Sequence, residues 1–235
     1  MRTKPEIRQE LWSLLEAKKV ARFPGATGRI PNFSGAEACA SQLAKTRWWQ
    51  KAKILKINPD SPQRAIRQRA LAEGKILYMA VPRLRAAKPF LELDPKKLKC
   101  SPYAASSIKG ASQYGRQVSL DEVRKIDLID CGSVAVNRKG ARVGKGGGYS
   151  DLEFALLAER KKVGPRTAIV TSVHPCQIVD EEIPMTKHDI PLSAIITPTE
   201  VIEIKRGFKA PQGIFWDMLS REKIDAIPVL SKMPS

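Results

Sequence analysis

Residues 142–151 read RVGKGGGYSD, and this glycine-rich segment separates a predicted strand from a predicted helix. Four of the five residues from 144 to 148 are glycines. Without a Cβ, backbone amides can curl closely around an anion, and the amino terminus of the following helix adds its dipole. The segment therefore predicts a phosphate-binding loop, with a merely flexible connection as the alternative. It has neither the Gly-x4-Gly-Lys-Ser/Thr spacing of a P-loop nor the acidic residue of a dinucleotide fingerprint.

The segments on either side of this loop alternate between strand and helix patterns. Amphipathic or capped helices are predicted at 4–20, 34–49, 61–71 and for about a dozen residues from Ser150 or Asp151. Apolar runs predict strands at 52–57, 75–82, 126–136, 167–173 and 193–204. We expect loops and short edge strands in 84–125 and a polar hairpin in 180–191. This order predicts an α/β fold with three layers, in which helices flank a central, mostly parallel sheet.

Local signals predict where two helices start. Ser34 with Glu37 has the spacing of a capping box, and Ser61 followed by Pro62 has that of an N-cap and a first helical residue. We expect one α/β domain over residues 1–204. Residues 205–235 are expected to form a carboxyl-terminal appendage packed on it.

Composition narrows the class of protein. A hydrophobic content of 43% with 28% charged residues is ordinary for a folded protein, which excludes wholesale disorder. The four cysteines are far apart, which disfavours a zinc site. The first residues carry charges throughout and no 18-residue apolar stretch occurs, so we expect a cytoplasmic protein without a membrane contact. The net charge of +17 is unusual and attracts anionic partners.

The loop resembles the Gly-x-Gly-x-Gly-Tyr-Tyr-Asp-Arg motif of the 5-formyltetrahydrofolate cyclo-ligases, also called methenyltetrahydrofolate synthetases. The matching positions are Gly144, Gly146, Gly148, Tyr149 and Asp151. Similarity continues in order over most of residues 4–200, including LAEGKILYMAVPRL (71–84) and VHPCQIVDEEIPMTKHDIPLSAIITP (173–198). The resemblance implies the three-layer cyclo-ligase fold.

The resemblance also implies ATP and Mg2+ as cofactors and assigns residues to them. Lys4 and Arg8, four residues apart on one helix face, resemble the cations that meet ATP phosphates; taken alone they would be an ordinary solvated pair. Asp151 and Asp189 are the expected metal ligands, although Asp151 is equally compatible with helix capping. The expected ATP-binding set is Lys4, Arg8, Arg142, Gly144, Lys145, Gly146, Gly147, Gly148, Tyr149 and Ser150.

In the family's reaction, ATP phosphorylates the formyl oxygen of 5-formyltetrahydrofolate. A second nitrogen then closes on the activated carbon, and phosphate leaves to give 5,10-methenyltetrahydrofolate. Positioning and charge neutralisation would carry this chemistry, so we assign no catalytic residue. Asn58 and Tyr149 are the expected substrate-binding residues. Gln177, His188 and Asp189 stand at the positions of the family's Gln and His-Asp residues, and His188 and His174 are interpreted as structural.

Three departures weaken the folate half of the resemblance. Ser150 stands where the motif has a second tyrosine, and Leu152 stands where it has an arginine. Asn58 begins Asn-Pro-Asp-Ser where the family has a Glu-x-x-Thr step at the reacting end of the folate. An amide at position 58 can hydrogen-bond a substrate but supplies no negative charge.

Three functions therefore remain open. The leading hypothesis is an ATP- and Mg2+-dependent cyclo-ligase, monomeric or homodimeric, that acts on formylfolate or a related small heterocycle. The first alternative is a divergent nucleotide-binding paralogue in another pathway. The second, disfavoured alternative is an RNA-binding protein that uses a basic and aromatic surface; paired tryptophans are more often packing residues. Its candidate residues are Lys45, Arg47, Trp48, Trp49, Lys51, Lys53, Arg64, Arg67 and Arg69.

Overall fold

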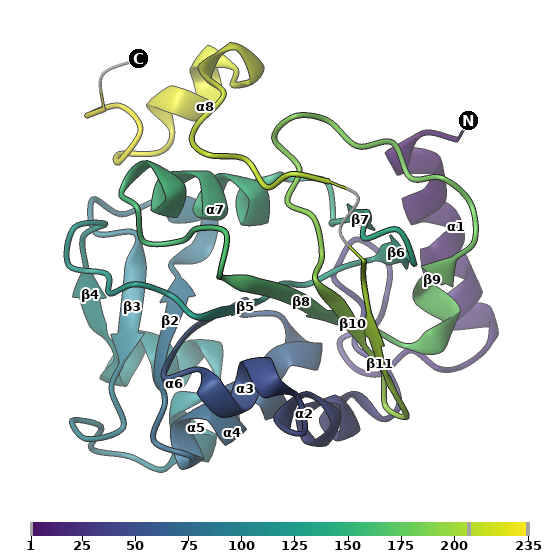
Figure 1. Ribbon diagram of the computed structural model, residues 1–235, viewed down its shortest axis with the longest axis horizontal. Coiled ribbons are helices and arrows are strands. Elements are labelled where there is room, and N and C mark those ends of the chain that lie inside the picture. The colour runs from purple at the N-terminus through teal and green to yellow at the C-terminus, as the bar shows by residue number, and fades with distance from the viewer. Residues whose placement is uncertain (1, 206–207, 234–235) are drawn as a thin grey trace.

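The computed structural model describes residues 2–205 and 208–233, and its centre is an eight-stranded sheet (Figure 1). The strand order is β11-β10-β8-β5-β1-β2-β3-β4. Five neighbouring strands, β10, β8, β5, β1 and β2, are parallel, and the strands at both ends are antiparallel. The bounds are β1 (Ile54–Ile57), β2 (Ile76–Ala80), β3 (Phe90–Leu93), β4 (Arg116–Val118), β5 (Leu128–Asp130), β8 (Ala168–Ser172), β10 (Ala194–Ile196) and β11 (Val201–Glu203).

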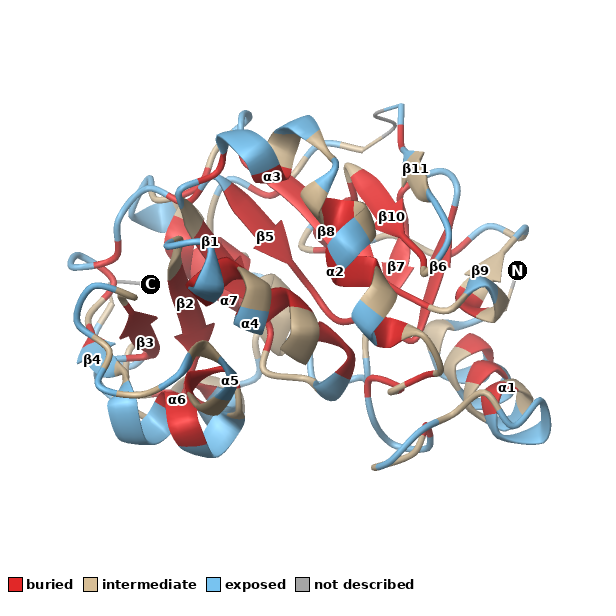
Figure 2. Ribbon diagram, turned by 90° about the horizontal axis from the view of Figure 1, so that it is seen from below, coloured by how far each residue is buried: buried red, intermediate tan, exposed pale blue. Residues whose placement is uncertain are grey.

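Helices cover both faces of this sheet, as expected for three layers. On one face lie α2 (Ala36–Ala44), α3 (Arg47–Lys51), α4 (Arg64–Ala72), α5 (Pro102–Ala105) and α6 (Ile108–Tyr114). On the other lies α7 (Tyr149–Glu159), and the tail with α8 (Arg221–Asp225) packs beyond it (Figure 1). The central strands are buried from both sides (Figure 2). The predicted three-layer α/β fold is confirmed.

A second, smaller sheet carries the glycine loop. It consists of β6 (Ala135–Asn137), β7 (Arg142–Val143) and β9 (Ile178–Val179), in the order β7-β6-β9. The first helix, α1 (Lys4–Ala17), packs against it through Ile7 and Leu11. Since β7 ends at Val143 and α7 begins at Tyr149, the loop 144–148 connects these two packed elements.

The order of the parallel strands creates a crevice at one sheet end. From β1 the chain moves through α4 to β2 on one side, whereas β5, β8 and β10 follow on the other side. Ligands bind at the carboxyl ends of strands where the order reverses in this way. The loops that follow β1 and β5 therefore flank the expected ligand site.

Some predicted boundaries were wrong. The helix predicted over 34–49 is two helices, and its N-cap is Gly35, in the left-handed region (φ 84°), without a side-chain cap from Ser34. Ser61 starts a short 3-10 turn (Ser61–Gln63) instead of capping α4.

Two other segments also differ from the prediction. The run 126–136 contains two strands, β5 and β6, which belong to different sheets. In 84–125, β3 is an inner, fully buried strand, and α5 and α6 were missed because prolines and lysines mask their short apolar faces. The polar segment 180–191 pairs no strands among the described residues.

Candidate functional site

The glycine loop has the backbone that its sequence predicts. Gly146 and Gly148 have φ values of +108° and +65°, in the left-handed region where other residues are strained. Tyr149 then opens α7, a helix of 11 residues, whose first turn contains Asp151. The loop thus presents close-approach backbone at a helix amino terminus, which suits an anion.

The amino-terminal part of α1 brings two cations to this region. Thr3 and Glu6 form a capping box that fixes where the helix starts. Lys4 Nζ lies 2.6 Å from Asp189 Oδ2, and Arg8 Nε donates a hydrogen bond of 2.8 Å to the Gly144 carbonyl. Residues 4, 8, 144 and 189 are therefore brought together from three separate parts of the chain.

Arg142 and Asp151 form a buried ion pair under the loop. Arg142 Nη2 lies 2.7 Å from Asp151 Oδ1, and Arg142 Nη1 donates to the Gly132 carbonyl at 3.2 Å. Burial works most strongly to lower the pKa of Arg142, but the charge and hydrogen bond of Asp151, together with Cys131 and Asp189, keep that pKa above its ordinary value. The pair anchors the start of α7 to β7.

The two carboxylates expected to hold a metal lie close to each other. Asp151 Oδ1 accepts the backbone N–H of Ile190, the residue after Asp189, at 3.1 Å. Burial works to raise the pKa of Asp189, yet the hydrogen bonds from Lys4 and Thr186 hold it below its ordinary value. Both groups offer carboxylate oxygens of the kind Mg2+ prefers, and each is already paired with a cation. Within residues 2–205 and 208–233, no cluster of three or more metal-ligating side chains occurs.

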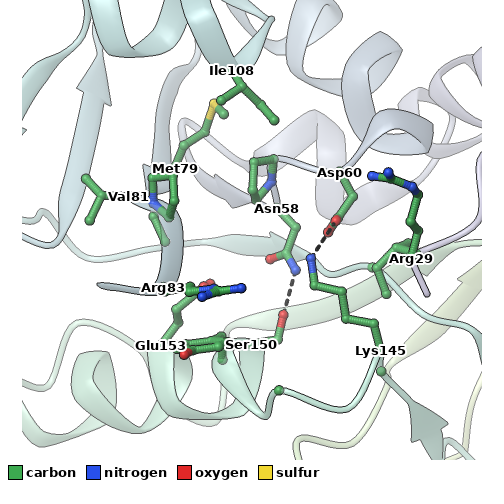
Figure 3. A pocket seen from close by; sticks show the side chains of 18 of the residues that line it. Arg29, Asn58, Asp60, Met79, Val81, Arg83, Ile108, Lys145, Ser150 and Glu153 are labelled. Atoms are coloured by element: carbon green, nitrogen blue, oxygen red, sulfur yellow. Dashed lines mark hydrogen bonds and ion pairs between the residues drawn. The ribbon is translucent and has the colours of Figure 1, made fainter. Parts of the chain in front are cut away.

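A cavity of about 600 Å³ opens on the other side of the glycine loop. Its second wall is formed by the ends of β1 and β2 and by the loop after β5, where the strand order reverses. Figure 3 shows Lys145 and Arg83 reaching into it from opposite walls. Of the predicted ATP set, the described lining includes all but Lys4, Arg8 and Gly146, which lie on the α1 side of the loop.

Asn58 stands in this cavity with both ends of its amide engaged. Its Oδ1 accepts a hydrogen bond of 2.5 Å from Lys56 Nζ, and its Nδ2 donates one of 2.5 Å to Ser150 Oγ (Figure 3). Lys56 is almost fully buried and is also ion-paired with Glu153 on α7. Asn58, which was predicted to bind the substrate, is therefore held in place by protein contacts, and one of these is with Ser150 of the predicted ATP-binding set.

The sequence of this chain matches a known protein family. A model of the 5-formyltetrahydrofolate cyclo-ligase family matches residues 1–198. The chain belongs to this family. A cyclo-ligase of Arabidopsis thaliana, described as mitochondrial, is 34% identical over 92 residues, which are 38% of this chain and 33% of that protein. The cyclo-ligase of Escherichia coli K12 is 35% identical over 79 residues, which are 34% of this chain and 40% of that protein. Both of these matches are confined to part of the chain.

Longer matches come from vertebrate proteins named methenyltetrahydrofolate synthase domain-containing protein. The Danio rerio and Mus musculus proteins are 37% and 38% identical over 98% of this chain, covering 61% and 63% of their own lengths. These matches include nearly all of this chain, which spans about three-fifths of the length of each of these relatives. Among solved structures, the Aquifex aeolicus 5,10-methenyltetrahydrofolate synthetase superposes with a TM-score of 0.55 at 20% identity, covering 88% of this chain and 95% of that one. That likeness supports the cyclo-ligase fold.

The basic and aromatic surface is only partly a surface. Trp49 is buried and donates from Nε1 to Glu73 at 2.6 Å. Arg67 is 1% exposed and donates to the backbone carbonyls of Asn58, Asp60 and Ser106. The prediction that these two residues could contact RNA is wrong, because both stabilise the core around α4. Trp48 remains half-buried beneath Arg47.

The two histidines interpreted as structural, and the family-matched Gln177, contact neighbouring protein groups. Gln177 is buried and donates to the carbonyls of Ser133 and Val134. His174 accepts the Cys176 N–H, and His188 lies within hydrogen-bond reach of Thr186 Oγ1. None of the helices in the described part of the chain is both long and apolar enough to cross a membrane.

Sequence reasoning missed four residues of this site. Lys56 could have been noticed as a lysine inside an apolar strand, and Glu153 as its partner only once α7 was placed. Arg83 has a positive φ of 53°, which is unusual for a side-chain-bearing residue and has no local sequence signal. Lys223 lies in the tail, 76 positions from the loop residue whose carbonyl it contacts.

Proposed function

We propose that this protein is an ATP- and Mg2+-dependent cyclo-ligase that converts 5-formyltetrahydrofolate to 5,10-methenyltetrahydrofolate. The observation that carries the proposal is the shared wall: residues of the glycine loop line a cavity of about 600 Å³ at the reversal of strand order. Cavities of about 300–1,000 Å³ are typical of sites for small organic ligands. A phosphate bound on the loop would therefore adjoin a substrate held in the cavity.

The residues present fit the phosphates of ATP. Gly146 and Gly148 offer left-handed backbone, and Arg8 with Lys4 provides positive charge from α1. Asp151 and Asp189 would hold Mg2+, with the phosphate oxygens completing its shell. ATP bound here would supply the phosphoryl group that activates the formyl oxygen and departs as phosphate after the ring closes.

The protein's own contribution is orientation and charge neutralisation. The loop backbone and the α7 dipole favour anionic oxygen, and the α1 cations offset charge that develops during phosphoryl transfer. The walls of the cavity keep the substrate close to the loop, which replaces a bimolecular encounter by a positioned one. No side chain needs to act as a nucleophile.

The environment of Asn58 favours a second candidate, a paralogue with another heterocyclic substrate. Because Lys56 and Ser150 each engage the amide of Asn58, it offers a substrate only one remaining lone pair and one remaining N–H. A glutamate at this position would place a negative charge beside a cationic intermediate, and an amide does not. A paralogue with another substrate would keep the nucleotide loop and have different contacts at the Asn58 wall of the cavity.

The deciding experiment is the spectroscopic detection of methenyltetrahydrofolate formed by the purified protein. Product should appear only when 5-formyltetrahydrofolate, ATP and Mg2+ are all present. A folded protein that binds ATP but forms no product would exclude the cyclo-ligase reaction and favour the divergent paralogue.

Site variants test the assignment independently of turnover. We expect Lys4→Met to weaken ATP binding about tenfold or more, the cost of one charge-assisted hydrogen bond. Lys18→Met, an exposed lysine at the other end of α1, serves as the matched control and should bind ATP as the wild type does. Equal ATP affinity of Lys4→Met and wild type would refute the assignment.

A further inference from the structure

The carboxyl-terminal tail, which lies beyond the residues matched by the family, places a lysine on the glycine loop. Lys223 Nζ donates a hydrogen bond of 2.9 Å to the Gly147 carbonyl and lies 5.2 Å from the centroid of the Tyr149 ring. A Cβ added at Gly148 would sit 3.2 Å from the same nitrogen. One ammonium group thus touches three consecutive residues of the loop.

Several contacts fix the tail in this position. Ser220 caps α8 by accepting the N–H of Lys223 at 3.2 Å. Ile227 and Leu230, each 1% exposed, pack in the same apolar cluster as Leu156 of α7. The Ile214 N–H donates to Glu159 Oε1 at 2.8 Å, at the other end of α7. Lys223 is therefore held by the packing of the tail.

The first turn of α7 lacks the cation that the family motif has there. Leu152 stands where the family motif has an arginine, and its side chain is 5% exposed, so the first turn of α7 carries no cation of its own. Arg8 approaches the loop at Gly144 and Gly146, from α1. Lys223 approaches at Gly147 and Gly148, from the tail. The two cations therefore bracket the loop.

The tail leaves open space beside this lysine. A small cavity of about 70 Å³ is lined by Gly148 of the loop, by Asp151 of α7 and by Phe215, Met218 and Lys223 of the tail. Burial lowers the pKa of Lys223, and the nearby charge of Asp151 acts in the opposite direction. A half-buried cation next to an open space and an anion-binding backbone is suited to a phosphate oxygen.

We propose that Lys223 binds a phosphate of the nucleotide and that the tail thereby completes the nucleotide site. This inference rests on the proposed function, because it requires ATP to bind at the glycine loop. Lys223 takes the place of the cation missing at position 152. The ligand class is a nucleoside di- or triphosphate, since a single phosphate on the loop could be served by the α1 cations alone.

The test is calorimetric titration of ATP, ADP and AMP into the full chain and its variants. Lys223→Met should weaken ATP binding by about tenfold to a hundredfold, as expected for the loss of a charge-assisted hydrogen bond, and should affect AMP less. Lys223→Arg should retain most of the affinity, because the positive charge is kept.

Arg221→Met is the matched control. Arg221 lies on the same short helix, its side chain is 87% exposed, and it pairs with Asp225. Its variant should bind ATP as the wild type does. Melting temperatures of all variants show whether the tail stays docked, and Lys223→Arg separates loss of charge from loss of packing.

The outcomes distinguish the two proposals. If wild type binds ATP and Lys223→Met binds it equally well, the role of Lys223 is refuted while the nucleotide site stands. If Lys223→Arg is as weak as Lys223→Met, a charge-based role is refuted too. If wild type binds no ATP, the proposed function fails and the inference fails with it.

Discussion

Asp130 is the most unusual single residue of the core. It ends β5 fully buried, and neither carboxylate oxygen makes a hydrogen bond of ordinary distance and angle to the described residues. Burial raises the pKa of Asp130 well above its usual range, although the charges of Arg67 and Lys56 pull it down. Those two cations are already engaged, Arg67 with backbone carbonyls and Lys56 with Asn58 and Glu153. The surroundings of Asp130 therefore compensate poorly for the charge of its ionised form.

We expect Asp130→Asn to stabilise the protein at neutral pH. A folded-state pKa above the unfolded value means that the folded form binds more protons between the two values, so stability falls as pH rises through that window. Asparagine keeps the shape and does not titrate. The free energy of unfolding should rise by about 1–3 kcal/mol at pH 7.5, with little gain near pH 4.

Chemical denaturation at the two pH values measures this difference. The control is Asp121→Asn, because the Asp121 side chain is 75% exposed and faces Arg160 at 3.6 Å. That variant should follow the wild type at both pH values. An Asp130→Asn protein that is less stable than wild type at pH 7.5 would mean that the ionised carboxylate is needed by the fold.

At the scale of elements, the sequence predicted those helices, strands and loops whose formation depends on neighbouring residues. The amphipathic spacing of α1, the apolar runs of β1, β2 and β8 and the glycine loop were all predicted because propensity and burial agree there. The split of 126–136 into β5 and β6 could not be predicted, since both halves are buried and only tertiary pairing separates them. The Ser34 cap failed because a left-handed Gly35 begins α2 instead.

The start of α1 links helix stability to the proposed nucleotide site. Thr3→Ala removes the hydroxyl of the capping box and leaves the Glu6 N–H without its partner. The loss should cost about 1 kcal/mol and lower the melting temperature by about 2–4 °C. Because Lys4 is the next residue, ATP affinity should fall as well.

Thermal melting and ATP titration check this prediction together. Thr3→Ser keeps the oxygen and should behave as wild type in both measurements. If Thr3→Ala melts with the wild type and binds ATP equally, the capping box does not position the α1 cations.

At the scale of the whole molecule, the site depends on contacts between distant segments. Lys4 meets Asp189 across 185 positions and Lys223 meets Gly147 across 76, and such pairs leave no pattern in a single sequence. The family resemblance assigned Lys4 to ATP and Asp189 to the metal without predicting their contact, whereas Lys223 lies outside the family match and was missed. The net charge of +17 likewise does not identify a partner, since Arg67 and Lys56 are among the cations used inside the fold.

Because the tail packs against the body, we expect the two to unfold together. Ile227 is 1% exposed and lies in the cluster that also contains residues of β5, β8 and α7. We expect Ile227→Ala to lower the free energy of unfolding by about 2–5 kcal/mol, the cost of removing a buried aliphatic side chain, within a single thermal transition. Met218→Ala, at a side chain that is 45% exposed, is the control and should change stability little. Differential scanning calorimetry distinguishes the outcomes: a second, low-temperature transition in wild type, or an unchanged transition in Ile227→Ala, would mean that the tail is a separate appendage that the body does not need.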